Sequence, residues 1–270
     1  MSASARTSPG PACRPAAEAL EHRLLLSAQP APPTTQVTDR RLIYNNSVYD
    51  QYDSDPVHDL GAIAPDKRAL LPGQGLAGFE NLSSYVKGIN GILVQFFSLA
   101  PFPHDVGPDD FDVRVGTLGD PAAWSLAPAP TVAVIPVPGP NQLYTLSWPD
   151  YTIRNTWLRA TVKANDHTGL ATPDVFYFGN LVGETGDGDS KTRAMPRVTA
   201  IDLARVLRER NTDAPITSVV DFNRDGRVNA IDLAVARAND GRSLPPLNST
   251  PSPIADGVTA AVRDDAPAIL

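Results

Sequence analysis

Cysteine and long apolar runs are scarce in this chain. Its 270 residues include one cysteine, Cys13, which excludes an internal disulfide, so stability has to come from packing, and bound ions stay open as a second source. No apolar run approaches the roughly 20 residues that cross a bilayer, so no membrane span is expected. The stretch RLLLSA is shorter than the roughly 7 to 15 apolar residues of a signal-peptide core, so export cannot be inferred from it.

Basic charge is scarce as well. Acidic residues outnumber basic ones by 30 to 23, which gives a formal charge of -7 and an isoelectric point near 5.0. No cluster of Lys and Arg stands out, and a chain of this charge would repel a phosphate backbone. Nucleic acid is therefore not an expected partner.

Catalytic groupings are missing. The four histidines share no spacing typical of zinc ligation or of a general base, and no serine stands in a G-x-S-x-G setting. Carboxylate pairs such as Asp109 with Asp110 could in principle serve a glycosidase, but solvated loop charges are the favoured interpretation. We therefore expect no catalytic residues and no enzymatic activity of the chain itself.

What is present is a strand pattern between residues 37 and 180. In FDVRV the apolar Phe111, Val113 and Val115 alternate with polar residues, so one face can be buried, and turns rich in Pro, Gly and Asn separate several such segments. The pattern predicts an antiparallel β-sandwich. Segments 1–36 and 246–270 are rich in Pro, Ser and Ala and predict a disordered leader and a disordered tail.

Aromatic residues allow two interpretations. Trp124, Trp148 and Trp157 could form a sugar-stacking platform on the sandwich, or they could belong to its core. The alternation around Trp148 and Trp157 favours the core.

The C-terminal part contains a repeat. RVTAIDLA at 197–204 recurs 30 residues later as RVNAIDLA at 227–234, which predicts two copies of one supersecondary unit sharing a small core. Each copy also fits a helix capping box, with Thr199 or Asn229 as N-cap and Asp202 or Asp232 three positions later.

The stretch DFNRDGRVNAID, 221–232, has oxygen-bearing residues at the alternate positions of a calcium loop, around a glycine that permits the sharp turn. A purely capping turn accounts for Asp232 but gives no reason for the other acidic side chains to converge, since unneutralised carboxylates repel each other. The sequence therefore predicts a Ca²⁺ site here. Its ligands are Asp221, Asn223, Asp225, Asn229 and Asp232 through their side chains and Arg227 through its backbone carbonyl.

The first copy lacks this register, because Lys191, Arg193, Met195 and Pro196 stand where the second copy has its ligands and glycine. Acidic residues occur further upstream, and an enlarged loop could bring them back to the helix. The alternative is a solvated glycine-rich turn, so a second calcium ion stays open. The candidate ligands are Glu184, Asp187, Asp189, Thr199 and Asp202.

These two loop-plus-helix repeats, over residues 180–242, resemble a type I dockerin. The resemblance implies a small all-α, EF-hand-like calcium module at 181–245 that binds cohesin modules of scaffold or surface proteins. Dockerins are often appended to polysaccharide-degrading enzymes, which links this chain to polysaccharide breakdown by association only. The recognition positions hold Ala200 and Ile201, and Ala230 and Ile231, where small polar residues are common in that family.

The segments YNNSVYDQ, DKRALLPGQG, YVKGINGILV and DVFYFGNLVGETG are similar to a module common in planctomycete surface and secreted proteins, where it precedes such repeats. LEHRLLLSA resembles the Leu-Glu-Pro-Arg-x-Leu-Leu-Ser motif of those proteins, with His22 in place of proline. The resemblances imply an extracellular or cell-surface protein that attaches to a cohesin-type partner or to its own surface assembly. Two alternatives stay open, a carbohydrate-binding or glycoside-hydrolase-associated sandwich tethered by the dockerin, and a purely structural surface protein stiffened by calcium.

Overall fold

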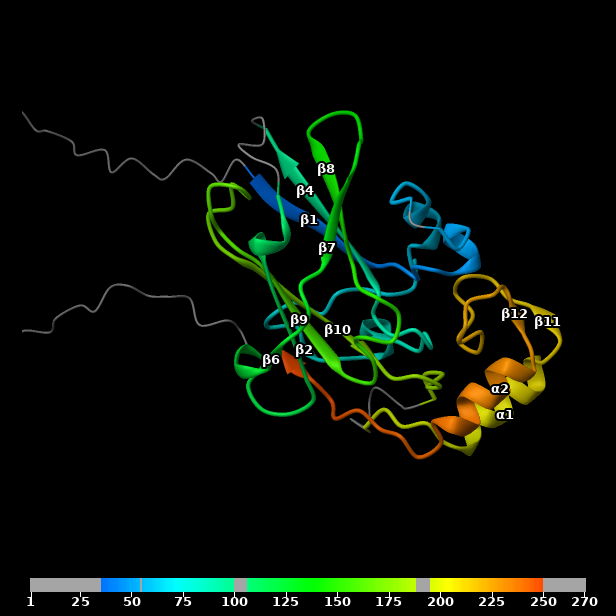
Figure 1. Cartoon of the computed structure of the whole chain (residues 1–270). Helices are drawn as coiled ribbons and strands as arrows, with labels where there is room; N and C mark the ends of the chain where they lie inside the picture. Colours follow the sequence, from blue (N-terminus) through cyan, green and yellow to red (C-terminus); the bar gives the residue numbers. More distant parts are fainter. Residues whose placement is uncertain (1–34, 54, 100–105, 188–194, 250–270) are drawn as a thin grey trace, which may run out of the picture. The chain divides into compact units, whose positions relative to one another are not determined.

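The computed structural model describes residues 35–53, 55–99, 106–187 and 195–249 (Figure 1). They are β-rich, with antiparallel sheets and two α-helices. Most of the expected leader and tail lies outside these residues, although strand β1 begins at Thr35 and strand β13 ends at Ser249. No helix in this described part of the chain has the length and apolar character needed to span a membrane.

The first sheet has four antiparallel strands, in the order β1 (Thr35–Leu42), β4 (Gly91–Ser98), β8 (Asn141–Ser147) and β7 (Thr131–Ile135). Strand β4 lies inside the sheet, and its sequence GILVQFF is apolar on both faces. Val94 and Phe96 pack into the largest core cluster, whereas Leu93 packs with Ile135 in a smaller cluster. A central strand covered on both sides requires this nearly continuous apolar run.

The second sheet has five strands, in the order β3 (Leu82–Ser83), β10 (Asp174–Asn180), β9 (Trp157–Val162), β5 (Phe111–Gly116) and β6 (Ser125–Leu126). Its pairings are antiparallel apart from the short parallel pair of β10 with β3. Gly179 lies opposite Trp157, and a Cβ atom at this glycine would lie 2.6 Å from the indole ring. The missing side chain therefore makes room for the tryptophan.

The two sheets pack face to face around one core, and we call this region the sandwich. The core draws from both sheets, with Val94, Phe96 and Leu146 from the first and Leu158, Val162, Phe176 and Phe178 from the second. Burial of these side chains stabilises the fold by roughly 1.5 to 3 kcal/mol for each large apolar residue.

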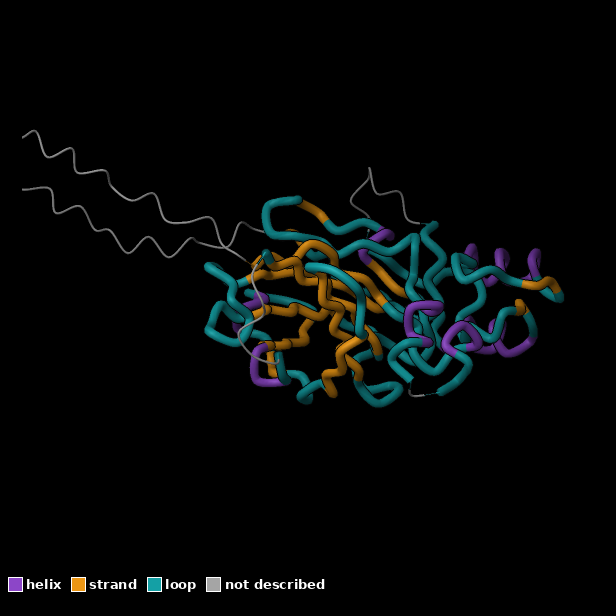
Figure 2. Tube along the Cα trace, turned by 90° about the horizontal axis from the view of Figure 1, so that it is seen from above, coloured by secondary structure: helices purple, strands orange, loops and turns teal. Residues whose placement is uncertain are grey.

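The expectation of a small all-α module at 181–245 is wrong. Helices α1 (Ala200–Glu209) and α2 (Ala230–Ala238) are present, but strands β11 (Thr212–Asp213) and β12 (Arg227–Val228) pair between them. In Figure 2 short strand segments lie beside the helices of this region. After α2 the chain forms β13 (Asn248–Ser249), which pairs with β2 (Gly75–Leu76) from the N-terminal half.

The physical reason is the shortness of the helices, which have ten and nine residues and cannot bury a complete core by themselves. Trp157 of β9 donates a hydrogen bond from Nε1 to the carbonyl of Pro245 at 2.7 Å. A mixed cluster joins residues beyond 180, namely Leu181, Val198, Leu244 and Leu247, to sandwich residues Leu70, Leu82, Trp124, Trp157 and Tyr177. The sandwich thus completes the core of the helical region.

Candidate metal centre

The two copies of the repeat fold in the same way. Thr199 and Asn229 are the N-caps of α1 and α2, and each side chain accepts a hydrogen bond from the backbone two residues later, at 3.1 Å and 2.7 Å. The Asp202 and Asp232 carboxylates accept the N-cap backbone N–H at 2.7 Å and 2.9 Å. Both capping boxes expected from the sequence are therefore present.

The two copies are also interlocked. Val228, which precedes α2, accepts a hydrogen bond from the N–H of Asn211 after α1 at 2.7 Å. Val198, which precedes α1, exchanges hydrogen bonds with Gly241 and Arg242 after α2, both at 2.9 Å. Each copy thus pairs with the segment that follows the helix of the other copy, and α1 and α2 lie side by side (Figure 1).

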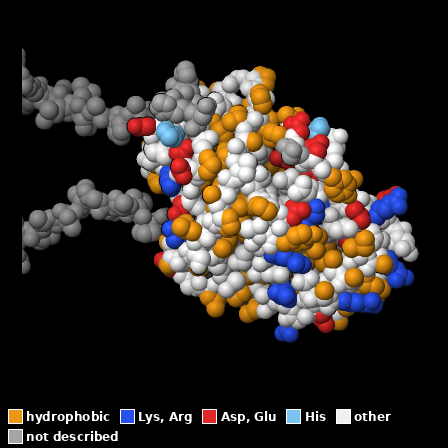
Figure 3. All heavy atoms as spheres, in the orientation of Figure 1, with side chains coloured by type: hydrophobic (Ala, Val, Ile, Leu, Met, Phe, Trp, Pro, Cys, Tyr) orange, Lys and Arg blue, Asp and Glu red, His pale blue; other side chains and the backbone are white. Residues whose placement is uncertain are grey.

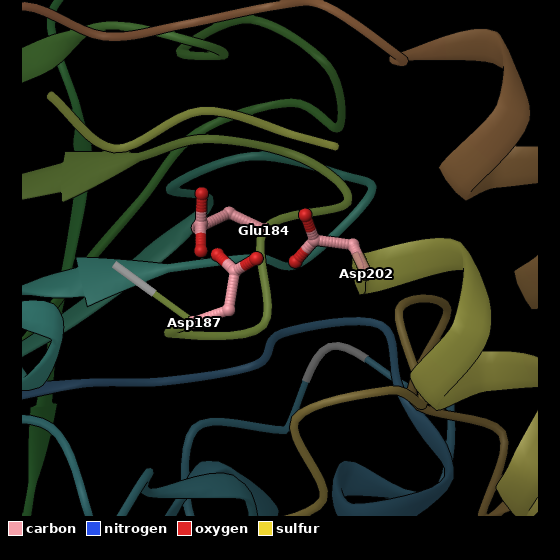
Figure 4. A group of neighbouring side chains, drawn as sticks. All are labelled: Glu184, Asp187 and Asp202. Carbon is pink, nitrogen blue, oxygen red and sulfur yellow. The ribbon is translucent and has the colours of Figure 1, made fainter. Parts of the chain in front are cut away.

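Three carboxylates of the first copy converge (Figure 4). Glu184 and Asp187 come from the loop after β10, and Asp202 comes from the first turn of α1. Each offers an oxygen atom, and these atoms lie within 4.8 Å of one another. Glu184 is 1% exposed and Asp202 is 0% exposed. This acidic cluster could hold a metal ion.

The electrostatics of the acidic cluster favour a bound cation. Burial, followed by the charge of Asp202, raises the pKa of Glu184 from 4.5 to about 7. Glu184 Oε2 is buried and has no hydrogen-bond partner among the described residues. None of the ion pairs among the described residues involves Glu184, Asp187 or Asp202. Oxygen-only donors of this kind suit a hard divalent cation.

A nearby arginine does not neutralise the cluster. Arg205 of α1 donates from Nη1 to the carbonyl and hydroxyl oxygens of Thr185, at 2.6 Å and 3.1 Å. Thr185 in turn donates from its backbone N–H to Asp202 Oδ1 at 2.8 Å. The guanidinium therefore supports the loop backbone and leaves the carboxylate oxygens facing each other.

The second loop is shaped by backbone N–H groups that donate hydrogen bonds to its side-chain oxygen atoms. Gly226 donates to Asp221 Oδ2 at 3.0 Å, and Asp225 donates to Asn223 Oδ1 at 3.2 Å. Burial raises the pKa of Asp221 to about 6 and also raises the pKa of Asp232. The Asp225 carboxylate accepts hydrogen bonds from the side-chain amides of Asn223 and Asn229, at 2.8 Å and 3.2 Å. The oxygen atoms of the same two amides accept the backbone N–H groups of Asp225 and Ile231.

Hydrogen bonds establish which residues of the two loops correspond. Asp202 Oδ1 accepts the N–H of Thr185, and Asp232 Oδ1 accepts the N–H of Phe222, both at 2.8 Å. Glu184 precedes Thr185 and Asp221 precedes Phe222, so Glu184 and Asp221 occupy equivalent positions in their loops. Thr199 Oγ1 and Asn229 Nδ2 each donate to an aspartate at 3.2 Å. The corresponding pairs are Glu184 with Asp221, Asp187 with Asp225, Thr199 with Asn229, and Asp202 with Asp232.

The remaining candidates from the sequence are placed as follows. Arg227 lies in β12 with an exposed side chain, and Asp189 lies outside the described residues. Trp124, Trp148 and Trp157 are at most 7% exposed, so they do not form a sugar-stacking platform. Asp110 accepts the N–H of Gly107 and caps the short helix η4 (Pro108–Asp110), which gives it a structural role.

Sequence reasoning missed Arg224, which follows Asn223 in the second loop and is 2% exposed. No signal in the sequence distinguishes it from an ordinary solvated arginine. No protein-family model matches the chain, and neither the curated proteins nor the solved structures include a match.

Proposed function

We propose that this chain is a non-catalytic extracellular attachment protein in which Ca²⁺ bound by the two loops fixes α1 and α2 for recognition of a cohesin-type protein. The observation that carries the proposal is the convergence of Glu184, Asp187 and Asp202 without a basic partner among the described residues. The corresponding places of the second loop also hold acidic residues, so both copies offer the same kind of site.

The donor set supports calcium over magnesium. Calcium takes six to eight oxygen ligands in flexible geometry, whereas magnesium demands a near-ideal octahedron and retains water. The second loop supplies five side chains and a backbone carbonyl within twelve residues. At a free calcium concentration of about 100 times the dissociation constant, each site would add about 2.7 kcal/mol to folding stability.

The helix face supports a protein partner. Ile201 and Ile231 stand at equivalent positions in the first turns of α1 and α2 and are 57% and 55% exposed, and Leu207 of α1 is 48% exposed. Apolar side chains that are exposed together can mark a protein interface. Figure 3 shows Lys and Arg side chains gathered over the region of the two helices. A partner with apolar contacts and an acidic rim would complement this face.

Isothermal titration of the full, metal-free chain tests the metal centre. We expect the wild-type chain to bind about two Ca²⁺ ions and to bind Mg²⁺ much more weakly. The Asp187→Ala variant and the Asp225→Ala variant should each bind about one Ca²⁺ ion, and the double variant should bind none. Asp213→Ala is the matched control, since this side chain is 95% exposed and lies next to the second loop. Absence of calcium binding at millimolar concentration would refute the proposal.

Binding to an immobilised type I cohesin module tests the partner. We expect retention in calcium, release by EGTA, and loss of retention in an Ile201→Glu, Ile231→Glu double variant whose calcium titration is unchanged. Calcium binding without cohesin retention would keep the metal centre and reject the cohesin partner.

A further inference from the structure

Arg224 connects the second loop to the sandwich. It follows Asn223 and precedes Asp225, its φ angle is +53°, and it is 2% exposed. Its guanidinium carbon lies 4.3 Å from the ring centroid of Tyr44, and Nη2 donates to the Tyr44 hydroxyl at 3.1 Å. Nη1 donates to the carbonyl of Ser218, and Nε has no hydrogen-bond partner among the described residues. Arg224 forms no ion pair among the described residues, and its charge acts on Asp221 of the same loop, where it works against the larger effect of burial, which raises the pKa of that carboxyl.

Tyr44 joins this contact to the main core of the sandwich. It follows β1, is 1% exposed and belongs to the core cluster that both sheets share. Its ring also packs against Tyr85 with an edge-to-face geometry at 5.3 Å. Arg224 therefore reaches from the second loop into the main core, where its cation lies against an aromatic face.

Hydrogen bonds also fasten the backbone of the second loop and of the segment before it to the sandwich, at Arg224 itself and at two residues that precede it. Val48 in the short helix η1 (Val48–Asp50) donates to the carbonyl of Arg224 at 3.0 Å. Val86 donates to the carbonyl of Phe222 at 2.8 Å. The Tyr49 hydroxyl donates to the carbonyl of Ala214 at 2.9 Å.

The direction of Arg224 depends on the shape of the loop. The side chains on either side of it, Asn223 and Asp225, bond each other at 2.8 Å, whereas Arg224 contacts the sandwich. The same backbone conformation thus presents two candidate ligands to one side and the guanidinium to the other. A cation that fixes Asn223 and Asp225 would also fix Arg224, and loss of that cation would leave the nearby carboxylates to repel each other.

We propose that calcium at the second loop stabilises the sandwich itself, and that Arg224 transmits this coupling. The proposal rests on the calcium site of the proposed function and extends its effect from the two helices to the two sheets. By reciprocity, the docked arginine also strengthens calcium binding, since coupling between two sites acts equally in both directions.

Tryptophan fluorescence can test the coupling. Trp148 lies in the core cluster that both sheets share and reports the sandwich, whereas Trp124 and Trp157 lie in the cluster where the sandwich meets the residues beyond 180. The experiment uses the full chain with Asp187→Ala, so that calcium acts through the second loop. We expect calcium at about 100 times its dissociation constant to raise the melting temperature detected by tryptophan by about 5 to 10 °C. The circular dichroism signal of the helices is expected to shift by the same amount.

Added to that background, Arg224→Met should retain calcium binding with an affinity reduced about 10- to 30-fold, and its tryptophan-detected shift should fall to about 2 °C or less. Tyr44→Phe keeps the ring and removes the hydroxyl, so it should reduce the tryptophan-detected shift in part. It replaces Arg224→Met as the test if that variant does not fold. Arg208→Met is the matched control, because this α1 side chain is 73% exposed.

The outcomes separate the two proposals. Calcium binding by titration, with a shift of the helix signal and no shift of the tryptophan signal, would overturn the coupling and leave the proposed function intact. An undiminished tryptophan shift in both the Arg224→Met and Tyr44→Phe variants would overturn the role of Arg224. Absence of calcium binding in the titration would refute the proposed function and the coupling together.

Discussion

Replacing Glu184 by glutamine should make the metal-free protein more stable at neutral pH. Burial and the charge of Asp202 raise the pKa of Glu184 from 4.5 to about 7 in the folded state. Between these pH values the unfolded chain releases the proton and the folded chain keeps it. The contribution of Glu184 to the free energy of unfolding is therefore fully present below about pH 4.5 and is lost as the pH rises through about 7.

The magnitude follows from the size of the shift. Each pKa unit corresponds to about 1.4 kcal/mol, so a shift from 4.5 to about 7 corresponds to about 3 kcal/mol. No discount for solvent screening is needed, because Glu184 is 1% exposed. A glutamine at this position cannot titrate, so the variant should gain about 3 kcal/mol relative to the wild type between pH 4.5 and pH 7.5.

Urea unfolding of metal-free protein at the two pH values measures this gain as a difference between variant and wild type. Other buried carboxyls with raised pKa values, such as Asp221 and Asp59, titrate in both proteins and cancel in that difference. Glu80→Gln is the control, since Glu80 is exposed. The reasoning is refuted if wild type and Glu184→Gln keep the same stability difference at both pH values. Calcium should reverse the order at pH 7.5, because the wild type keeps all its carboxylate ligands.

Three further changes test the fold and the caps. Gly88→Ala should lower the free energy of unfolding, measured in urea, by at least about 1 to 3 kcal/mol, because φ is +88° and the new Cβ would lie 2.2 Å from the carbonyl oxygen of Ile153. Phe222→Ala removes a fully buried ring from the core between the loop and the helices, so calorimetry should show a loss of about 3 to 5 kcal/mol; a loss below about 1 kcal/mol would contradict this packing. Asn229→Ala removes the N-cap of α2 and should lower the stability of the metal-free protein by about 1 kcal/mol, and titration should show weaker calcium binding. An unchanged calcium affinity would remove Asn229 from the ligand set.

Several elements could be predicted from the sequence because their signals are local. The alternation of Phe111 and Val113 marks a strand that is present as β5, and the buried rings of Trp148 and Trp157 agree with the alternation around them. The capping boxes at Thr199 and Asn229 are local hydrogen-bond patterns within four residues, so the sequence indicates them directly.

The sequence could not show that the expected all-α module is wrong, because the contacts that decide this join residues far apart in the chain. Leu244 and Leu247 have apolar partners more than 60 residues away in the sandwich, and β13 pairs with β2 across the chain. A resemblance between repeats carries no information about such contacts. The correspondence of Glu184 with Asp221 also depends on a loop that is seven residues longer in the first copy.

The sequence by itself determined the strand periodicity, the duplicated capped helices and the spacing of the oxygen-bearing residues in the second loop, because each depends on residues that are neighbours along the chain. Only the tertiary structure decided that Glu184, Asp187 and Asp202 meet and that Arg224 enters the core beside Tyr44. Those contacts join segments far apart in the sequence, and their geometry depends on how the whole chain packs.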